Sequence, residues 1–328
     1  MYTTTTVAIL GAGSFGTAIA IHLARAGNQV KLFSHDTAHV AAMCNLRCNQ
    51  RYLPQFNFPD TLYPYANLLD CIHNAEHIII AVPSHAFAAI LCQLPDNIGC
   101  LSWLTKGIDP NTNQLFSSLI AQRFGNNLPI AVISGPSFAK EVAAQLPTAL
   151  VVAGNDAVYT HKVQALLHHA QMRIYFSDDY IGIQWCGAIK NILAIACGIS
   201  DGLNYGANAK AALITRGLEE MRRFGSFFHA HIHTFLGLAG VGDLVLTCTD
   251  DQSRNRRFGL LLGAGVTSAD AIQQIGQVVE GAHNAAQIVK IAAHNHIDMP
   301  ICNAVHAILT NNITPQQAVS KLMHRPKI

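Results

Sequence analysis

A single charged side chain interrupts a long apolar segment of this chain. Residues 181–199 read IGIQWCGAIKNILAIACGI, and Lys190 is the charged residue among them. At helical spacing its neighbours include Ile183, Leu193 and Cys197, so the ammonium would lose much of its hydration. Lost hydration lowers the pKa of a lysine toward the range used in proton transfer. Lys190 is therefore a candidate acid–base group; the alternative is a lysine that reaches solvent along its own stem.

A second polar group lies in residues 237–259, which read GLAGVGDLVLTCTDDQSRNRRFG. Asp243 follows a glycine-rich turn and is a plausible partner for a lysine ammonium. Ser253 has the character of a helix N-cap, which places Arg254 and Asn255 in the first helical turn. A guanidinium, an amide and free backbone N–H groups together form a phosphate site. The alternative, a basic turn that binds RNA, is disfavoured because no aromatic residues are interleaved with the cations.

The N-terminal half of the sequence contains a glycine-rich pattern between a predicted strand and a predicted helix. Gly11, Gly13 and Gly16 form the pattern GAGSFG. The elements predicted around it are a strand over 3–10, a helix over 17–26 and a strand over 29–34. In this βαβ setting Gly11 permits the tight turn, Gly13 lets the backbone approach a pyrophosphate, and Gly16 allows close helix–sheet packing. The pattern predicts a dinucleotide site.

The residues after the second strand normally decide which nicotinamide coenzyme binds. An acidic residue there holds the ribose 2′-hydroxyl of NAD, whereas a cation accommodates the 2′-phosphate of NADP. This chain has Ser34, His35 and Asp36, which point in both directions. The cofactor is therefore predicted to be NAD or NADP, and we expect both to be used.

The fold class follows from how apolar runs alternate with helical ones. Further strands are predicted over 77–82, 100–104, 129–133, 149–153 and 172–176. Helices are predicted over 181–198, 208–224, 267–276, 282–295 and 301–311. We expect an α/β protein with a Rossmann-type, doubly wound, mostly parallel sheet, followed by an all-α C-terminal domain. The predicted domains are 1–180 for dinucleotide binding and 181–328 for substrate binding and catalysis. Lys106, Gly135 and Ser137 follow strands, where open sheets bind ligands.

Composition narrows the class of protein. The 328 residues are 50% hydrophobic and 12% charged with a net charge of +2, which favours a globular protein without a nucleic-acid partner. Nine cysteines without a CxxC pair indicate reduced thiols. No metal is expected, because His229, His231 and His233 alternate without a carboxylate and are interpreted as surface or helix-end residues. The chain has no basic leader and no apolar run judged long enough for a bilayer, so we expect a soluble, cytoplasmic protein without an integral membrane segment.

Taken together, these motifs resemble bacterial-type NAD(P)-dependent glycerol-3-phosphate dehydrogenase. The matching segments run along the whole chain: GAGSFGTA at 11–18, TKG at 105–107, SGPSFAKEV at 134–142, GAIKNILAIA at 187–196, ITRGL at 214–218, GLAGVGDLVLTCT at 237–249, SRNRRFG at 253–259 and VVEG at 278–281. The resemblance implies reversible reduction of dihydroxyacetone phosphate to sn-glycerol 3-phosphate for phospholipid synthesis, and the expected assembly is a homodimer.

The resemblance also implies roles for individual residues. Lys190 is expected to be the catalytic proton donor and acceptor, assisted by Lys106 and Asp243. The substrate residues that it implies are Lys106, Gly135, Ser137, Asp243, Ser253, Arg254 and Asn255. The cofactor residues, with the three loop glycines, are Gly11, Gly13, Ser14, Phe15, Gly16, His35, Lys106, Ala139, Arg254, Val278 and Glu280.

Two other readings stay open on the sequence alone. A related Rossmann-plus-helical dehydrogenase acting on a β-hydroxy acid or a ketopantoate-like substrate would also use a helical lysine, but with a carboxylate site in place of the phosphate site. A dinucleotide-sensing protein could keep the fold without the chemistry. The set Lys106, Lys190 and Asp243 argues against that second reading.

Overall fold

The computed structural model describes residues 4–324, and this part of the chain forms two compact units. The first comprises the chain up to Thr105 together with Phe116–Tyr180. The second comprises Lys106–Leu115 and the chain from Ile181 onward. The segment Lys106–Leu115 was not expected to leave the first unit. Lys106 therefore belongs to the helical unit, although it follows a strand of the sheet.

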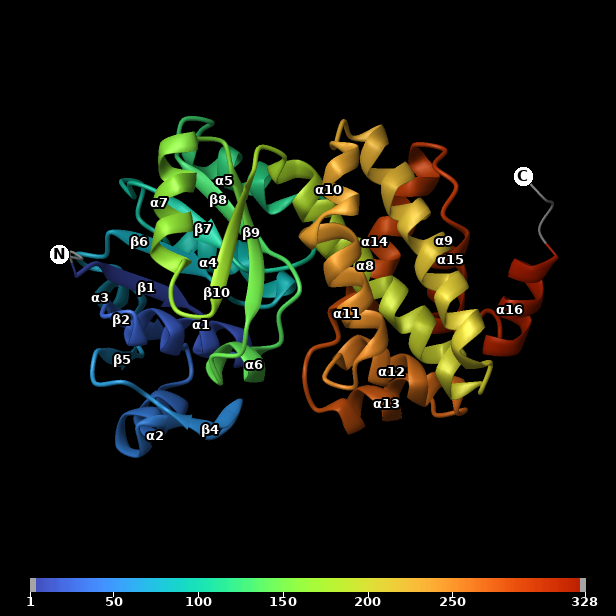
Figure 1. Ribbon diagram of the computed structural model, residues 1–328, viewed down its shortest axis with the longest axis horizontal. Coiled ribbons are helices and arrows are strands. Elements are labelled where there is room, and N and C mark those ends of the chain that lie inside the picture. The colour runs from blue at the N-terminus through green and yellow to red at the C-terminus, as the bar shows by residue number, and fades with distance from the viewer. Residues whose placement is uncertain (1–3, 325–328) are drawn as a thin grey trace. The chain divides into compact units, whose positions relative to one another are not determined.

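The first unit is built on an eight-stranded sheet (Figure 1). Its strands are β1 (Thr6–Leu10), β2 (Gln29–Phe33), β5 (Leu62–Tyr65), β6 (His77–Ile80), β7 (Leu101–Trp103), β8 (Ile130–Ser134), β9 (Thr148–Gly154) and β10 (Met172–Ser177). Their spatial order is β10-β9-β8-β7-β6-β1-β2-β5. Pairing is parallel except between β8 and β9. The expected doubly wound, mostly parallel sheet is confirmed.

The strand order reverses between β1 and β6, where the chain returns after building β2 and β5 outward. In open α/β sheets, ligands bind beside the carboxyl ends of the strands at such a reversal. Position 11, directly after β1, requires glycine. Gly11 has φ +130°, and a Cβ there would lie 2.5 Å from the carbonyl oxygen of Ala81. The glycine-rich segment thus stands at the switch point of the sheet.

Seven helices of the first unit connect these strands: α1 (Ser14–Arg25), α2 (Thr37–Leu46), α3 (Leu68–Ile72), α4 (Ser84–Gln93), α5 (Phe116–Phe124), α6 (Ala139–Ala143) and α7 (Ala157–Leu167). A short hairpin, β3 (Cys48–Asn49) and β4 (Leu53–Asn57), follows α2. The central strands are buried on both faces, as Val7, Ile9 and Leu32 illustrate at 0% exposure. This explains why they read as continuous apolar runs rather than alternating patterns.

Within the described residues from 181 to 324, the second unit consists of helices joined by short turns, with no strand. Its elements are α8 (Tyr180–Gly202), α9 (Gly206–Phe227), α10 (Ile232–Leu236), the π-helix η1 (Leu238–Gly242), α11 (Asp243–Thr249), α12 (Arg254–Gly263), α13 (Ser268–Ile275), α14 (Glu280–His294), α15 (Pro300–Leu309) and α16 (Pro315–Met323). The predicted all-α C-terminal region is confirmed. The sequence missed α10, α11 and α16, and it missed the π-helix.

Helix α8 is the core of the second unit. It is long and apolar enough to cross a bilayer, which corrects the expectation that no such run exists, but 94% of its apolar window is buried inside the protein. Its backbone also contacts that of α12. A Cβ on Gly259 would lie 2.1 Å from the carbonyl oxygen of Ile195, and one on Gly198 would lie 2.0 Å from that of Arg256. This close contact fixes the helix that begins at Arg254 against the helix that carries Lys190.

Candidate active site

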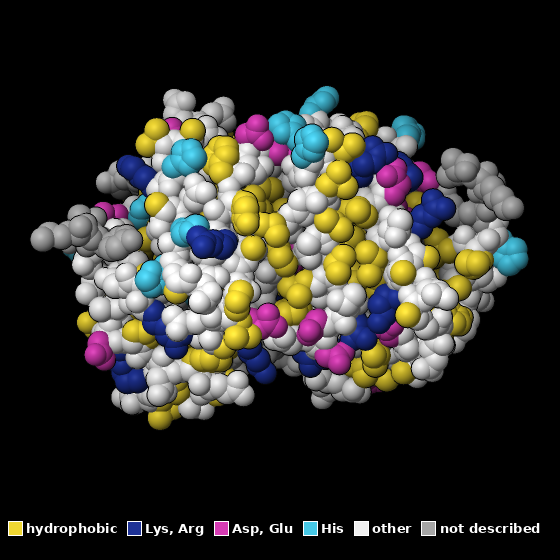
Figure 2. Space-filling view, in the orientation of Figure 1, with side chains coloured by type: hydrophobic (Ala, Val, Ile, Leu, Met, Phe, Trp, Pro, Cys, Tyr) yellow, Lys and Arg dark blue, Asp and Glu magenta, His cyan; other side chains and the backbone are white. Residues whose placement is uncertain are grey.

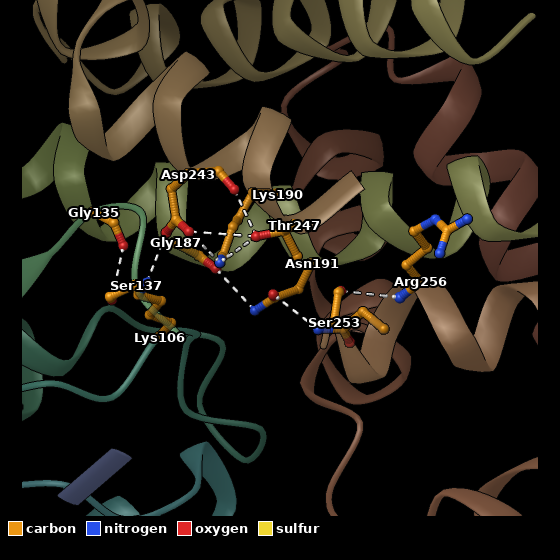
Figure 3. Close-up of polar contacts among 11 residues, drawn as sticks. Lys106, Gly135, Ser137, Gly187, Lys190, Asn191, Asp243, Thr247, Ser253 and Arg256 are labelled. Carbon is orange, nitrogen blue, oxygen red and sulfur yellow. Dashed lines mark hydrogen bonds and ion pairs between the residues drawn. The ribbon is translucent and has the colours of Figure 1, made fainter. Parts of the chain in front are cut away.

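Lys190 is buried and points at two oxygen atoms of α11 (Figure 3). Its Nζ donates to Asp243 Oδ1 at 2.7 Å and to Thr247 Oγ1 at 2.9 Å. Only 6% of the residue is exposed, so the alternative of a lysine that reaches solvent is wrong. The ammonium has been withdrawn from water and is held by specific acceptors instead.

Asp243 joins Lys190 to a second lysine. Its Oδ2 accepts from Lys106 Nζ at 2.7 Å, while its Oδ1 accepts from Lys190. The carboxylate is 1% exposed and Lys106 remains partly accessible, with 17% of its side chain exposed. Two cations therefore share one anion, and the cluster keeps a net positive charge. Such a site suits a substrate atom on which negative charge develops.

Lys190 and Asp243 both have shifted pKa values. Burial lowers the pKa of Lys190 to about 8; Asp243 opposes this and the charge of Lys106 adds to it. Burial acting alone would raise the pKa of Asp243, but the charges of Lys106 and Lys190 outweigh it and bring the pKa below its usual value. At neutral pH Lys190 is mostly protonated and yet close to its pKa. It can therefore give up a proton and regain it.

The segment before Asp243 explains how this carboxylate is aimed. The expected glycine-rich turn is a π-helix, Leu238–Gly242, and Asp243 begins α11 directly after it. Thr247 lies one turn further along the same helix, so the two side chains share a face. The Thr247 hydroxyl donates to the carbonyl oxygen of Asp243 at 2.6 Å and so turns its lone pairs toward Lys190. Sequence reasoning missed Thr247; its i+4 spacing from Asp243 was the available signal.

Gly187 lies one turn before Lys190 on α8. A Cβ at Gly187 would lie 3.4 Å from Cβ and Cγ of Lys106, an ordinary contact distance. The space beside Gly187 is thus filled by the stem of Lys106. The glycine brings this second lysine close to the helix of the first.

The N-terminus of α12 begins at the predicted N-cap. The Ser253 hydroxyl accepts from the backbone N–H of Arg256 at 3.2 Å, which confirms the predicted N-cap. Arg254 and Asn255 then occupy the first turn, where backbone N–H groups lack helical partners. Burial lowers the pKa of the Arg254 guanidinium, whose hydrogen bond is to Gln277 Oε1 at 3.4 Å. The charge of Glu280 opposes the effect of burial, and Arg254 is not held by a short carboxylate hydrogen bond of the kind that Arg256 has, so it keeps capacity for a phosphate.

The neighbouring Arg256 has a different environment. Its guanidinium donates to Asp201 Oδ2 at 2.9 Å and 2.6 Å and also pairs with Asp251. Because two carboxylates already neutralise it, Arg256 holds α12 to the end of α8. The three arginines of SRNRR thus differ in environment: Arg256 is paired with carboxylates, Arg254 retains binding capacity, and Arg257 is exposed.

Asn255 connects α12 to α8 and α14. Its Nδ2 donates to Asn191 Oδ1 at 3.0 Å, and its Oδ1 accepts from the backbone N–H of Gly281 at 2.9 Å. Asn191 directly follows Lys190 and is buried, and its own amide donates to the carbonyl of Gly187 at 3.2 Å. The proposed phosphate residues and the lysine cluster therefore share one hydrogen-bonded framework. Asn191 was not assigned a role from the sequence.

Gly135 and Ser137 belong to the first unit and follow β8. Gly135 is buried with φ +123°, and a Cβ would lie 3.2 Å from the carbonyl oxygen of Ala149. Ser137 Oγ donates to the Gly135 carbonyl at 3.2 Å. The substrate roles inferred for both residues stay predictions.

The glycine-rich loop fits a dinucleotide. A Cβ on Gly16 would lie 2.1 Å from the carbonyl oxygen of Gly11, which explains close packing at that position. A Cβ on Gly13, in contrast, would meet no atom within 4 Å. Gly13 therefore faces open space, as expected where a pyrophosphate approaches the backbone. It also caps α1 without a side-chain bond, so the N–H groups of the first turn face the same region.

The other predicted coenzyme residues lie in both units. In the first, Phe15 and Ala139 pack partly buried against the core, Ser14 Oγ donates to the carbonyl of Tyr52 at 3.2 Å, and His35 is exposed after β2. In the second, Val278 and Glu280 flank the start of α14 and are partly buried. The coenzyme roles of these residues remain predictions.

The histidines that imitate a metal site do not gather around one. His229, His231 and His233 are all exposed, and His229 has φ +59° while His231 precedes α10. Within residues 4–324 no group of three or more His, Cys, Asp or Glu residues is arranged to hold a metal ion. All nine cysteines are free thiols.

Comparison with known proteins gives the same family over both units. Residues 6–159 match the sequence model described as NAD-dependent glycerol-3-phosphate dehydrogenase N-terminus, and residues 179–320 match that of the C-terminus. A Legionella pneumophila protein named glycerol-3-phosphate dehydrogenase [NAD(P)+] is 61% identical over 321 residues, 98% of each chain. One from Thioalkalivibrio sulfidiphilus with the same name is 50% identical and covers 97% of each.

Solved structures agree with the sequences. The crystal structure of glycerol-3-phosphate dehydrogenase from Coxiella burnetii has a TM-score of 0.95, with 48% identity over 98% of this chain and 99% of that one. A ketopantoate reductase from Ralstonia eutropha reaches a TM-score of 0.59 at 17% identity, which shows a shared fold alone. By matches that cover nearly its whole length, the chain belongs to the NAD-dependent glycerol-3-phosphate dehydrogenase family.

Proposed function

We propose that this protein reversibly reduces dihydroxyacetone phosphate to sn-glycerol 3-phosphate, with NADH or NADPH as the reductant. The observation that carries the proposal is the buried Lys190 held by Asp243 and Thr247 beside Lys106, in a chain of this family. The relatives are named glycerol-3-phosphate dehydrogenase [NAD(P)+], and this name, which covers both coenzymes, supports the same reaction.

Reduction of the ketone creates a negative charge that the lysine cluster is suited to neutralise. When bound, the reduced nicotinamide supplies the hydride that is added to C2 of the ketone. Lys190 donates its proton to the carbonyl oxygen as that oxygen becomes an alkoxide, and the product hydroxyl results. Lys106 adds a second positive charge that polarises the carbonyl. In the reverse direction, neutral Lys190 takes the proton from the substrate hydroxyl.

Asp243 has two roles in this proposal. It holds both ammonium groups in fixed positions, and its charge opposes the burial that lowers the pKa of Lys190. The residue therefore acts through the lysines. With a pKa of about 8, Lys190 is within reach of both protonation states near neutral pH.

The phosphate of the substrate is assigned to the start of α12. Arg254, the Asn255 amide and the N–H groups after Ser253 are the groups that would hold the dianion. Gly135 and Ser137 are proposed as further substrate contacts through backbone N–H and hydroxyl. Binding energy from the phosphate can then position the carbonyl for reaction.

The coenzyme is assigned to the glycine-rich loop of the first unit. Gly11, Gly13 and Gly16 shape the loop, and Ser14, Phe15, His35 and Ala139 are proposed contacts. Lys106, Arg254, Val278 and Glu280 are the contacts proposed from the helical unit. We further propose that the product supplies glycerophospholipid synthesis, and that the enzyme works in the cytoplasm as a homodimer.

A steady-state assay tests the activity. Purified protein should oxidise NADH and NADPH when dihydroxyacetone phosphate is added, and should leave both nearly unchanged with ketopantoate or a β-keto acid. Turnover with one of the acids and not with the phosphate would transfer the protein to the rival dehydrogenase class. Coenzyme binding without turnover of any ketone would favour a dinucleotide sensor.

A further inference from the structure

The turn after β2 contains a carboxylate whose two oxygens have separate partners. Asp36 Oδ1 accepts from the backbone N–H of His39 at 3.0 Å and caps α2. Asp36 Oδ2 pairs with the guanidinium of Arg51 at 3.0 Å. The backbone hydrogen bond from His39 lowers the pKa of Asp36, and Arg51 acts in the same direction, so the carboxylate is charged at neutral pH. An acidic residue and a cation thus occupy the same turn.

The hairpin that carries Arg51 is fastened to the glycine-rich loop independently of this ion pair. Asn49 is 0% exposed, and its amide donates to the carbonyl of Ala12 at 2.9 Å and to Thr17 Oγ1 at 2.8 Å. Ser14, in the loop itself, donates to the carbonyl of Tyr52. Arg51 is therefore held next to the dinucleotide loop by its neighbours on both sides.

The Arg51 side chain contributes little to this anchoring. It is 57% exposed, and ion pairs this exposed to solvent contribute little to stability. Its guanidinium lies 5.7 Å from the centroid of the Tyr52 ring, which orients it further. The other arginine of the hairpin region, Arg47, is engaged by the carbonyls of Leu62 and Pro59 at 2.9 and 2.6 Å. Arg51 is the better placed of the two to meet a ligand.

In dinucleotide-binding folds the end of β2 is where the adenosine ribose lies. A carboxylate there accepts from the 2′-hydroxyl of NAD, and an arginine accommodates the 2′-phosphate of NADP. A chain with the carboxylate alone would repel the phosphate, and one with the arginine alone would lack an acceptor for the hydroxyl. Here the two groups neutralise each other until a ligand engages one of them.

We propose that Asp36 and Arg51 form a divided selectivity site, in which Asp36 accepts the 2′-hydroxyl of NAD and Arg51 binds the 2′-phosphate of NADP. This rests on the proposed use of nicotinamide coenzymes but not on the identity of the ketone. In the sequence the turn Ser34-His35-Asp36 has no arginine for a 2′-phosphate. The structure supplies one from the next hairpin, because Arg51 pairs with Asp36. Dual coenzyme use then follows from an exchangeable ion pair.

The first test measures binding without turnover, using two nucleotides that differ by one phosphate. Adenosine 2′,5′-bisphosphate and adenosine 5′-monophosphate are titrated into the whole protein by calorimetry. Arg51→Ala should weaken the bisphosphate by about tenfold or more, the scale of a charge-assisted hydrogen bond, and leave the monophosphate within about twofold. Arg173 is an exposed arginine on β10, so Arg173→Ala makes the same change of charge. It should change the affinity for neither nucleotide.

The second test uses the opposite variant. Asp36→Asn removes the negative charge. It keeps the N-cap of α2, because asparagine caps helices as well as aspartate does. It should strengthen binding of the bisphosphate, and in fluorescence titrations it should shift preference from NADH toward NADPH, while Arg51→Ala shifts it toward NADH. Equal losses for both nucleotides in Arg51→Ala would make the ion pair structural. Unchanged affinity of Arg51→Ala for both nucleotides would place the 2′-phosphate elsewhere. Either of these two results would overturn the proposal, whether or not dihydroxyacetone phosphate is the substrate.

Discussion

The hydroxyl of Thr247 lies 2.9 Å from the ammonium of Lys190 and accepts its hydrogen bond. The proton of that hydroxyl is already committed to the carbonyl of Asp243. Thr247 can therefore only accept from Lys190, and it favours the charged form of the lysine. We therefore expect the uncharged oxygen of Thr247, as well as the carboxylate of Asp243, to influence the pKa of Lys190.

Thr247→Val removes this acceptor while keeping the shape of the side chain. A hydrogen bond to a charged group contributes about 1.5–3 kcal/mol, so the pKa of Lys190 should fall by about one to two units. The alkaline limit of ketone reduction should move to lower pH by that amount in a profile of kcat. Thr247→Ser keeps the hydroxyl and should stay near the wild-type profile; an unshifted limit in Thr247→Val would show that the contact does not control the lysine.

The wild-type enzyme should respond to pH in opposite ways in the two directions. Reduction needs protonated Lys190, so its rate should decline as pH rises through about 8. Oxidation of glycerol 3-phosphate needs the neutral lysine and should rise through the same pH. Initial rates in both directions with saturating substrates check this. Parallel profiles for the two directions would assign the proton to another group.

Lys190→Ala should lower kcat by at least about a hundredfold, the usual scale for a general acid–base group. Coenzyme affinity, measured by titration of NADH fluorescence, should be retained because the glycine-rich loop is unchanged. Lys321→Ala, at an exposed position of α16, serves as the matched control. Near-normal turnover by folded Lys190→Ala would contradict the catalytic assignment.

The sequence predicted the elements that rest on local signals. The glycine pattern, the isolated Lys190 and the Ser253 cap each follow from a few neighbouring residues, and the structure has them where expected. Partners contributed by distant segments were harder to predict. Thr247 is separated from Lys190 by 57 positions, and Arg51 reaches Asp36 from the next hairpin.

The direction of β9 and the different environments of Arg254 and Arg256 could not be predicted from the sequence, for a related reason. The antiparallel pairing of β8 with β9 depends on the path of the chain between them and leaves no mark in their apolar runs. Arg254 and Arg256 lie two positions apart in the same basic run. Only the location of Asp201 and Asp251 decides which of them is neutralised.

The free energy of unfolding should depend on the protonation of Glu220, a buried acid outside the lysine cluster. Burial raises the pKa of Glu220 to about 7 from 4.5, although the N–H groups of Ile301 and Cys302 at the start of α15 oppose it. Because the folded state binds this proton more tightly than the unfolded chain, the contribution of Glu220 to stability is present below pH 4.5 and is lost as pH rises through about 7.

The variant Glu220→Gln isolates this effect. The free energy of unfolding of the wild type, relative to that of the variant, should fall by about 3 kcal/mol between pH 4.5 and 7, the energy of the pKa difference. Urea denaturation at several pH values gives both curves. Their difference matters rather than either curve alone, since other carboxylates titrate in the same range. Curves that stay parallel would mean that Glu220 is charged in the folded protein.

Arg254→Ala should separate phosphate binding from chemistry. Its guanidinium has the Gln277 amide oxygen as a hydrogen-bond partner at 3.4 Å, whereas Arg256 is neutralised by two carboxylates. Removing Arg254 should leave a substrate dianion poorly paired, at a cost of about 2–5 kcal/mol in kcat/KM for dihydroxyacetone phosphate. The loss with unphosphorylated dihydroxyacetone should be much smaller, because that ketone gains nothing from the phosphate site.

Arg257→Ala provides the control for Arg254→Ala, since it removes the same charge from an exposed position of the same helix. Both ketones should be compared on the wild type and the two variants at fixed ionic strength, because a dianion responds to screening by salt. If Arg254→Ala lowers kcat/KM by the same factor for both ketones, the residue serves the coenzyme or the fold, and the phosphate must be bound by other groups. A loss confined to the phosphorylated ketone, absent in Arg257→Ala, would assign the phosphate to the start of α12.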